Sequence, residues 1–440
     1  MPGRRWKGRT GSLTRLEWLA LAAIVAGATI RALWVFVFHQ PFDHVYSDML
    51  IYVERGQRLA AGGELVRFDA SYPPGTHLLI ALPSLIFGSD RDGLWGAAVL
   101  WWLMSSLTPF FMWRFARLVL TPAAAALTAI FCALWPLLIT YAGYFLSDTP
   151  STLFLAVALW LAARAIRAHG RSAAAFGAGA GLTGGFALET RPQVALNLAV
   201  VAAMLLFPWR RHLPAFATFL VAGAAALSIA IVHNSIAAGK LTAINENSGQ
   251  VFWQGQCDVA WVYYGPENRE TYSFAAPAAL QRGGGTDYRF LTRQPWDQGA
   301  FYRDGLDCVR ENGPAHLRIL GRSLVDMTAT TVPWPQSNEP ELKEFVNLTN
   351  VLYSIALPVI LFQSFLLIRR RRREGGGSGE LLMLLHLACG FATALIFLGD
   401  PRYRIPYDVF GLALLAALLA DAFLDRRERR ESVRAVAQPV

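Results

Sequence analysis

The chain of 440 residues is 54% hydrophobic and only 16% charged, whereas soluble domains carry about 25% charged residues. This composition excludes an ordinary soluble domain and predicts a protein that spans a membrane. The net charge of +9 does not indicate a nucleic-acid partner, because most basic residues gather in short clusters between apolar runs.

Apolar runs along the chain predict an all-α, polytopic membrane protein with ten transmembrane helices. The first run is too long for a cleavable signal sequence and lacks a small-residue cleavage site, so we interpret it as a retained signal anchor. The fifth and sixth runs are the weakest. The predicted spans are 16–38, 94–114, 121–141, 146–164, 173–188, 194–209, 214–236, 346–368, 381–398 and 404–424.

The basic residues predict how these helices are oriented. If the N-terminal segment, 1–15, is cytoplasmic, alternate loops should be rich in arginine, and they are. Counting the short apolar piece 76–88 as a span would break this alternation; it contains Pro83, and we predict that it lies at the membrane interface. The basic clusters are Arg4, Arg5, Lys7 and Arg9; Arg114 and Arg117; Arg164, Arg167 and Arg171; Arg210 and Arg211; 369–373; and Arg426, Arg427, Arg429 and Arg430.

This orientation divides the chain into membrane regions, 16–236 and 346–424, and two long extracytoplasmic segments. The first outer loop covers 39–93. The second outer segment, 237–345, is rich in Gly, Pro, Trp and Tyr with mixed charges, and predicts a small loop domain packed on the membrane part. The tail, 425–440, is cytoplasmic, so the sequence predicts a multi-pass protein of the cell (inner) membrane with both termini inside.

The four cysteines divide between these regions. Cys132 and Cys389 lie within predicted spans, where a free cysteine behaves as a small apolar side chain. Cys257 and Cys308 both fall in the second outer segment, on an oxidising side of the membrane, so a disulfide between them is a hypothesis.

Several charged residues stand out once the orientation is fixed. They lie in short outer loops, where charge is not needed for orientation and is costly near lipid. Together with Asp48 in the first outer loop, they are predicted to converge on one face of the membrane. They are Asp148, Glu189, Arg191, Asp400, Arg402 and Arg404.

Some of these residues have simple structural interpretations. Asp148 precedes Thr149-Pro150 and could cap a helix whose first turn holds the proline. Glu189 and Arg191 could form a local ion pair at a turn. Arg31, inside the first span, could extend its guanidinium to the interface.

The pair Arg402 and Arg404, on either side of Tyr403, is harder to explain structurally. Two arginines on the non-cytoplasmic side oppose the positive-inside bias, which favours an anionic partner. The planar guanidinium group suits phosphate oxygens in particular.

The first outer loop predicts a helix that begins near Ser47, a good N-cap residue. Asp48, Tyr52 and Arg55 fall at positions i, i+4 and i+7, so this helix would place them along one face. The rigid turn at 72–75, Tyr-Pro-Pro-Gly, then leads into the predicted interfacial helix.

The sequence contains few signals for other chemistry. His77 follows the proline turn and is more often a hydrogen-bonded polar residue than a catalyst. No metal-ligand cluster, nucleophile elbow, P-loop or dinucleotide fingerprint is present. The glycine-rich stretch 176–185 lies within a predicted span and is better explained by close helix packing than by phosphate binding.

In their order along the chain these motifs resemble the integral-membrane glycosyltransferases of the GT-C superfamily, in particular the protein O-mannosyltransferase and aminoarabinose-transferase-like branch. The resemblance covers residues 16–424. NENSGQVFWQGQ (245–256) also looks like a loop motif of bacterial relatives. The motifs that carry the resemblance are Asp48, YPPGTHLLIALPSLIFG (72–88), SDTPSTLFLAVALWLAARA (147–165) and GDPRYRIPYDVF (399–410).

The resemblance implies an inverting transferase that moves a sugar from a polyprenyl-phosphate donor to an acceptor hydroxyl at the extracytoplasmic face, without a metal or other cofactor. It implies that Asp48 is the catalytic general base. Arg191, Arg402 or Arg404 would bind the donor phosphate and stabilise it as it leaves. Further site candidates are Asp148, Glu189, Tyr52, Arg55, His77, Tyr72, Asp400 and Tyr403.

Two departures from the family pattern leave the substrates open. Ser47-Asp48 stands where the protein mannosyltransferases have two adjacent acids, and Tyr72 stands where the aminoarabinose transferases have a lysine. The acceptor is therefore a glycan, a lipid or a protein. The alternatives are a polyprenyl-linked lipid transporter or flippase, which needs charges along a path through the bilayer, and a non-catalytic relative, which does not require Asp48.

Overall fold

The computed structural model describes residues 14–206, 209–257, 259–263, 273–277, 289–291, 296–328 and 334–436. The basic N-terminal cluster that entered the orientation prediction lies outside these residues. The helices are α1 Arg15–Leu33, η1 Trp34–Phe38, η2 Pro41–Asp43, α2 Asp48–Ala60, η3 Arg67–Ser71, α3 Gly75–Phe87, α4 Arg91–Val119, α5 Pro122–Leu134, α6 Pro136–Thr140, η4 Tyr141–Gly143, α7 Asp148–Arg167, α8 Gly170–Thr190, η5 Pro192–Val194, α9 Ala195–Leu206, α10 Trp209–Ala238, α11 Ser248–Gln256, α13 Gln298–Asn312, η6 Gly313–Ala315, α14 His316–Met327, η7 Gln336–Asn338, α15 Pro340–Arg373, α16 Ser378–Ile396, η8 Pro401–Arg404 and α17 Ile405–Val436.

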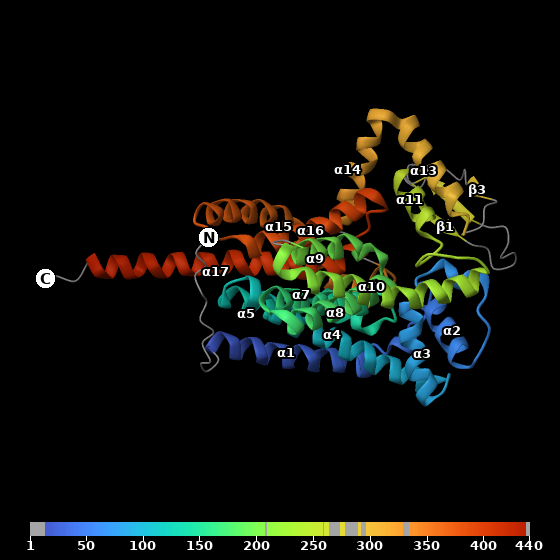
Figure 1. Ribbon diagram of the computed structural model, residues 1–440, viewed down its shortest axis with the longest axis horizontal. Coiled ribbons are helices and arrows are strands. Elements are labelled where there is room, and N and C mark those ends of the chain that lie inside the picture. The colour runs from blue at the N-terminus through green and yellow to red at the C-terminus, as the bar shows by residue number, and fades with distance from the viewer. Residues whose placement is uncertain are drawn as a thin grey trace.

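The long helices run side by side along the long axis of the molecule (Figure 1). At one end of this bundle, opposite the C-terminus, α2 and α3 lie close to a smaller unit made of α11, α13 and three strands. The strands β1 Val259–Tyr263, β2 Ser273–Pro277 and β3 Arg289–Leu291 form an antiparallel sheet in the order β1-β2-β3. We call this end of the bundle the loop end, and the unit of α11, α13, α14 and the sheet the cap.

The all-α, multi-pass fold class is confirmed, but the count of ten spans is not. Among the described residues each predicted span contains a helix, but seven helices are long and apolar enough to cross a membrane, or eight with the bent pair at 122–143. The two weakest predictions account for the difference. Helix α8 is 21 residues long but glycine-rich, and α9 has only 12 residues.

The short helix α3 has the properties predicted for an interfacial segment. Its 13 residues are too few to cross a bilayer. Leu85 and Ile86 leave 63% and 74% of their surface exposed, so an apolar side of this helix is free of protein contacts. Such a surface suits the boundary between lipid and water.

The glycine-rich stretch in α8 packs closely against α10, as predicted. A Cβ atom added at Gly181 would lie 2.0 Å from the carbonyl oxygen of Phe219, and one at Gly177 would lie 2.2 Å from that of Ala215. Because any side chain would force the two backbones apart, glycine allows the close contact that small residues provide in membrane helices.

Helix α5 breaks from α6 at Pro136, and the two segments of this broken span are bent by 50°. Proline has no N–H for the carbonyl of Cys132, four residues earlier. Arg31 of α1 supplies the missing donors: its Nη2 lies 3.2 Å from the Cys132 carbonyl oxygen and its Nη1 lies 2.6 Å from that of Ala133. The prediction that Arg31 extends to the interface is therefore wrong, since its side chain is fully buried at the helix break.

Replacement of Arg31 by methionine should destabilise the protein by about 1–3 kcal/mol, the cost of leaving buried polar groups without partners. The measurement is thermal unfolding of the purified protein in detergent. Arg15→Met, at the exposed start of the same helix, is the matched control and should unfold like the wild type. Equal unfolding temperatures for the two variants would contradict this role of Arg31.

The two outer-segment cysteines are joined as hypothesised. Cys257 follows α11 and forms a disulfide with Cys308 of α13, so the bond ties two helices of the cap together. Cys132 and Cys389 are free and buried, as predicted for cysteines that fill apolar positions.

Candidate active site

A cavity of about 160 Å³ opens at the loop end, where the membrane helices meet the cap. Two groups of residues within its lining, here called the charged lining and the neutral lining, differ in chemistry. The charged lining consists of Asp48, Tyr52, Tyr72, Arg191, Arg402 and Tyr403. The neutral lining consists of Asn245, Asn247, Ser248 and Val251, which lie at and just before the start of α11.

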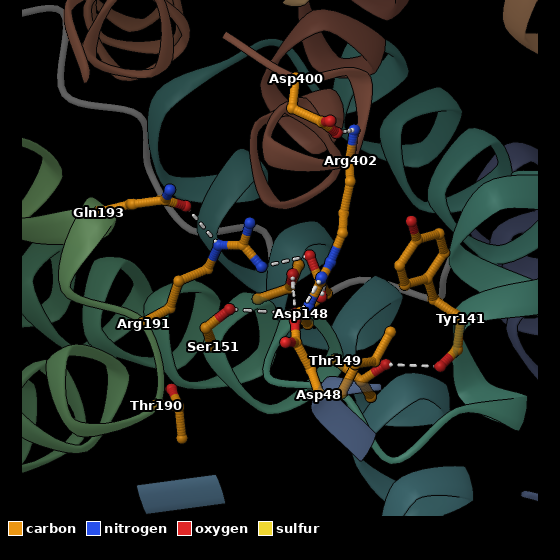
Figure 2. A network of polar contacts seen from close by, with 12 residues as sticks. Asp48, Tyr141, Asp148, Thr149, Ser151, Thr190, Arg191, Gln193, Asp400 and Arg402 are labelled. Carbon is orange, nitrogen blue, oxygen red and sulfur yellow. Dashed lines mark hydrogen bonds and ion pairs between the residues drawn. The ribbon is translucent and has the colours of Figure 1, made fainter. Parts of the chain in front are cut away.

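Four charged side chains at this cavity form a continuous polar chain (Figure 2). Asp48 Oδ2 accepts a hydrogen bond from Arg402 Nη1 at 2.9 Å, and Asp148 Oδ2 accepts one from Arg402 Nε at 3.2 Å. Asp148 Oδ1 also accepts from Arg191 Nη1. Arg402 therefore bridges two carboxylates, and the charges of the chain sum to zero.

The members of this polar chain differ in their access to the cavity. The Asp148 side chain is completely buried, while 28% of the Asp48 side chain is exposed. Asp148 is therefore fixed between two guanidinium groups, and the alternative that it only caps a helix does not describe its contacts. Of the two carboxylates in the polar chain, Asp48 is therefore the one that a bound molecule can reach.

Aromatic rings hold both guanidinium groups in place. The Arg402 guanidinium carbon lies 4.8 Å from the centre of the Trp334 ring, and that of Arg191 lies 5.1 Å from the centre of the Tyr403 ring. Arg191 Nε also donates a hydrogen bond to Gln193 Oε1 at 2.6 Å. Stacking and hydrogen bonds of this kind orient a guanidinium while leaving other N–H groups for an anion.

The local fold places Asp48 at the first residue of α2, as the sequence predicts. Ser47 occupies the N-cap position, but its side chain makes no capping hydrogen bond. Its backbone has a φ of 52°, a conformation that costs a residue other than glycine about 1–3 kcal/mol. This turn directs Asp48 towards Arg402, and Tyr52, one helical turn later, follows it into the cavity. Burial, and then the Asp48 carboxylate, raise the pKa of Tyr52, so its hydroxyl stays protonated.

Arg55 lies on the same helix but serves the cavity indirectly. It forms an ion pair with Asp69 at 3.1 Å and donates a hydrogen bond to the carbonyl of Phe68 at 2.6 Å. Its guanidinium carbon also lies 5.2 Å from the centre of the Tyr72 ring. Arg55 therefore supports Tyr72, which lines the cavity, and does not line it itself.

Arg404, predicted to bind the donor phosphate, lies outside the cavity lining. All three of its guanidinium nitrogens are engaged by protein groups: Nε by Asp408 at 2.9 Å, Nη1 by Ser354 at 3.1 Å and Nη2 by Asn350 at 2.5 Å. Its side chain is fully buried. The residue joins α15 to α17 and is not part of the cavity lining.

Glu189 and His77 also lie outside the cavity lining. Glu189 Oε1 accepts a hydrogen bond from the backbone N–H of Ala230, so the alternative of a local ion pair with Arg191 is wrong. His77 Nε2 lies 3.1 Å from His233 Nε2, and burial followed by that neighbour lowers the pKa of His77. Both side chains join α10 to its neighbours.

Asp400 orients Arg402 through the backbone. It is the N-cap of η8, and its Oδ1 accepts a hydrogen bond from the Arg402 N–H at 2.7 Å. Pro401 at the first helical position is typical of such a start. Burial raises the pKa of Asp400, partly offset by this hydrogen bond. Asp400 thus sets the direction in which Arg402 leaves the backbone.

Known proteins share this arrangement of helices. The family described as dolichyl-phosphate-mannose-protein mannosyltransferase matches residues 71–236. Two structures of the Archaeoglobus fulgidus oligosaccharyltransferase AglB, one with an inhibitory peptide and a dolichol-phosphate and one tethered to an acceptor peptide, align with TM-scores of 0.53 and 0.54 at 14% identity. They cover 96% and 95% of this chain. The fold is that of the GT-C glycosyltransferases.

The GT-C resemblance noted in the sequence is therefore confirmed at the level of the fold. The chain spans 52% and 51% of the two oligosaccharyltransferase chains, about half of each. ArnT from Cupriavidus metallidurans, bound to undecaprenyl phosphate, aligns with a TM-score of 0.40 at 16% identity, over 92% of this chain and 78% of that chain. No curated protein matches the sequence.

In this GT-C fold the family match covers one part of the polar chain. Asp148 and Arg191 lie within residues 71–236, whereas Asp48 and Arg402 lie on either side of the matched region. The cavity is therefore assembled from the matched helices and from two segments far apart in the sequence.

Some residues that line the cavity were absent from the predicted site. Asn245, Asn247 and Ser248 belong to the stretch that resembles a bacterial loop motif, so a sequence signal for them existed. Trp334, which stacks on Arg402, was missed entirely. A tryptophan between two prolines in an outer loop is the feature that could have drawn attention to it.

Proposed function

We propose that the protein is a membrane glycosyltransferase that moves a sugar from a polyprenyl-phosphate donor to an acceptor hydroxyl, with inversion at the anomeric carbon. The observation that carries this proposal is one cavity lined by a reachable carboxylate, Asp48, and by two oriented guanidinium groups, Arg191 and Arg402. A carboxylate can accept a proton from a hydroxyl, and guanidinium groups can hold a phosphate.

In the proposed reaction the acceptor oxygen attacks the anomeric carbon while the bond from that carbon to the phosphate oxygen breaks. Asp48 takes the proton of the attacking hydroxyl. The electron pair of the broken bond stays on the polyprenyl phosphate, and the arginines stabilise its charge. The step needs no oxidant, reductant or cofactor besides the donor itself.

The ion pair between Asp48 and Arg402 suggests how donor binding prepares the base. Arg402 donates a hydrogen bond to the Asp48 carboxylate, and a donor phosphate would compete for the same guanidinium N–H groups. Asp148 remains neutralised by Arg191 when Arg402 turns towards the donor. Donor binding would then free Asp48 for the acceptor, so the base becomes active when a sugar is present.

The proposal also assigns a side of the membrane and an acceptor class. The loop end faces the extracytoplasmic side, because the arginine-rich 369–373 segment ends α15 and predicts a cytoplasmic position for the opposite end. Both termini are then cytoplasmic. The neutral lining of amide and hydroxyl groups suits a hydroxyl-bearing glycan, lipid or protein acceptor.

A transfer assay tests this function. The purified protein is incubated with a panel of polyprenyl-phosphate sugars and hydroxyl-bearing acceptors, and the anomeric configuration of the product is determined by NMR. We expect one donor class to be consumed with inverted configuration. Movement of intact donor across proteoliposomes without cleavage would instead support a transporter, and neither cleavage nor movement would support a non-catalytic relative.

A further inference from the structure

Three side chains of metal-ligand type meet close to the first outer loop, although no such cluster was predicted from the sequence. His39 and His44 precede α2, and Glu339 precedes α15, 300 residues after His39. His39 Nε2 lies 2.8 Å from Glu339 Oε2, and His44 Nδ1 lies 3.7 Å from Glu339 Oε1. One ligand atom from each residue falls within 4.8 Å of the other two.

The surroundings hold these side chains close together. The imidazole rings of His39 and His44 stack with their centres 3.7 Å apart and 11° between their planes. Trp34 also stacks on His39, with the ring centres 4.6 Å apart. The hydroxyl of Tyr144 donates a hydrogen bond to Glu339 Oε1 at 2.8 Å. Hydrogen bonds to a ligating carboxylate are the usual support for a metal site.

We propose that His39, His44 and Glu339 bind one divalent transition-metal ion, with zinc as the best match. Zinc takes imidazole nitrogen and carboxylate oxygen at about 2.0–2.2 Å, and tetrahedral geometry then places ligand atoms roughly 3.4 Å apart. His39 Nε2 lies 2.8 Å from Glu339 Oε2 and His44 Nδ1 lies 3.7 Å from Glu339 Oε1, so the three side chains are within reach of one ion. To bind it, the two stacked imidazole rings would rotate so that a nitrogen of each points at the ion. Two neutral imidazoles and one carboxylate leave a positive site with a fourth position for water.

A simple ion pair explains the arrangement less completely. His39 alone satisfies such a pair with Glu339, whereas here a second imidazole nitrogen is directed at the same carboxylate. The site also has an open side: His39 is 3% exposed and Glu339 17%, but 33% of the His44 side chain is accessible. A metal ion can therefore enter past His44.

The position of the site indicates a structural role. None of the three ligands belongs to the cavity lining. The metal would join the loop that leads to Asp48, four residues after His44, to the segment in which Trp334 stacks on Arg402. The metal would thus fix the position of Asp48 relative to that of Arg402. The inference does not depend on the proposed glycosyl transfer, because binding is measured without substrate.

Metal titration of the full chain tests the site. The protein is purified without a polyhistidine tag, stripped with a chelator and titrated with zinc in competition with a chromophoric chelator, and with cobalt to record the absorption of a tetrahedral ion. We expect one zinc ion per chain. His44→Ala and Glu339→Gln should each weaken binding at least about 10-fold, whereas His169→Ala, at an exposed histidine between α7 and α8, should not.

Thermal unfolding of each variant without metal establishes that it is folded, and Glu339→Gln preserves the shape of the side chain and its contact with Tyr144. Absence of stoichiometric zinc binding to the wild type would overturn the proposal and leave the cluster as an ion pair. Wild-type affinity in a folded His44→Ala or Glu339→Gln variant would overturn it as well.

Discussion

Asp48→Asn should lower the rate of sugar transfer by about 10²- to 10⁴-fold, the contribution typical of a positioned general base. The amide has nearly the shape of the carboxylate but cannot accept the proton of the acceptor hydroxyl. The substitution also removes the ion pair that holds Arg402 at 2.9 Å. Donor affinity should therefore stay the same or increase while turnover is lost. The measurements are steady-state transfer and equilibrium binding of the polyprenyl-phosphate sugar.

This combination distinguishes a base from a residue that supports the fold. Asp43→Asn is the matched control, since Asp43 lies in the same loop, is exposed and forms a long 3.8 Å ion pair with Arg91. It should keep wild-type turnover. Full activity in Asp48→Asn would remove Asp48 from the mechanism. Loss of donor binding together with turnover would show that Asp48 acts on the donor instead.

Arg402→Gln should weaken donor binding by roughly 10- to 100-fold, because hydrogen bonds to a charged group contribute about 1.5–3 kcal/mol. Glutamine retains hydrogen-bond donors but lacks the positive charge. Asp148 keeps Arg191 as its partner, so the buried carboxylate is not left without a cation. The measurement is binding of the polyprenyl-phosphate sugar and of the polyprenyl phosphate alone, which should be affected equally.

Two further arginine variants serve as controls for the loss of donor binding expected in Arg402→Gln. Arg318→Gln, at an exposed position on α14, should bind donor like the wild type. Arg404→Gln should lower the unfolding temperature, since it disrupts a buried network, while its folded fraction binds donor normally. Unchanged donor affinity in Arg402→Gln, or an equal loss in Arg404→Gln, would contradict the assignment of the phosphate site.

The sequence predicted those features that depend on local pattern. Long apolar runs gave the helices, Ser47-Asp48 gave the start of α2, and the outward charges gave most of the polar chain. The broken span at Pro136 was visible as a proline, but the role of Arg31 was not, because its partners lie on another helix more than 100 residues away. Distant partners of this kind leave no periodic signal.

The same limit explains why Arg402 and Arg404 could not be separated in advance. They are two residues apart in one short turn, and they point to different surroundings. Which one reaches the cavity depends on Asn350 and Ser354 of α15, which engage Arg404. Glu339 was missed for a related reason, since it comes from an irregular segment whose position follows from packing and not from sequence periodicity.

The two linings of the cavity come from parts of the chain that can change separately. The arginines and acids lie on α2, on α7, at the end of α8 and on η8, outside the cap, while Asn245 and Ser248 are held by Gln298 of the cap. Exchange of the cap between related chains would alter the amide and hydroxyl groups that face a substrate without disturbing the paired charges. Such an architecture allows selection to diversify recognition on one side while the chemistry on the other is inherited unchanged.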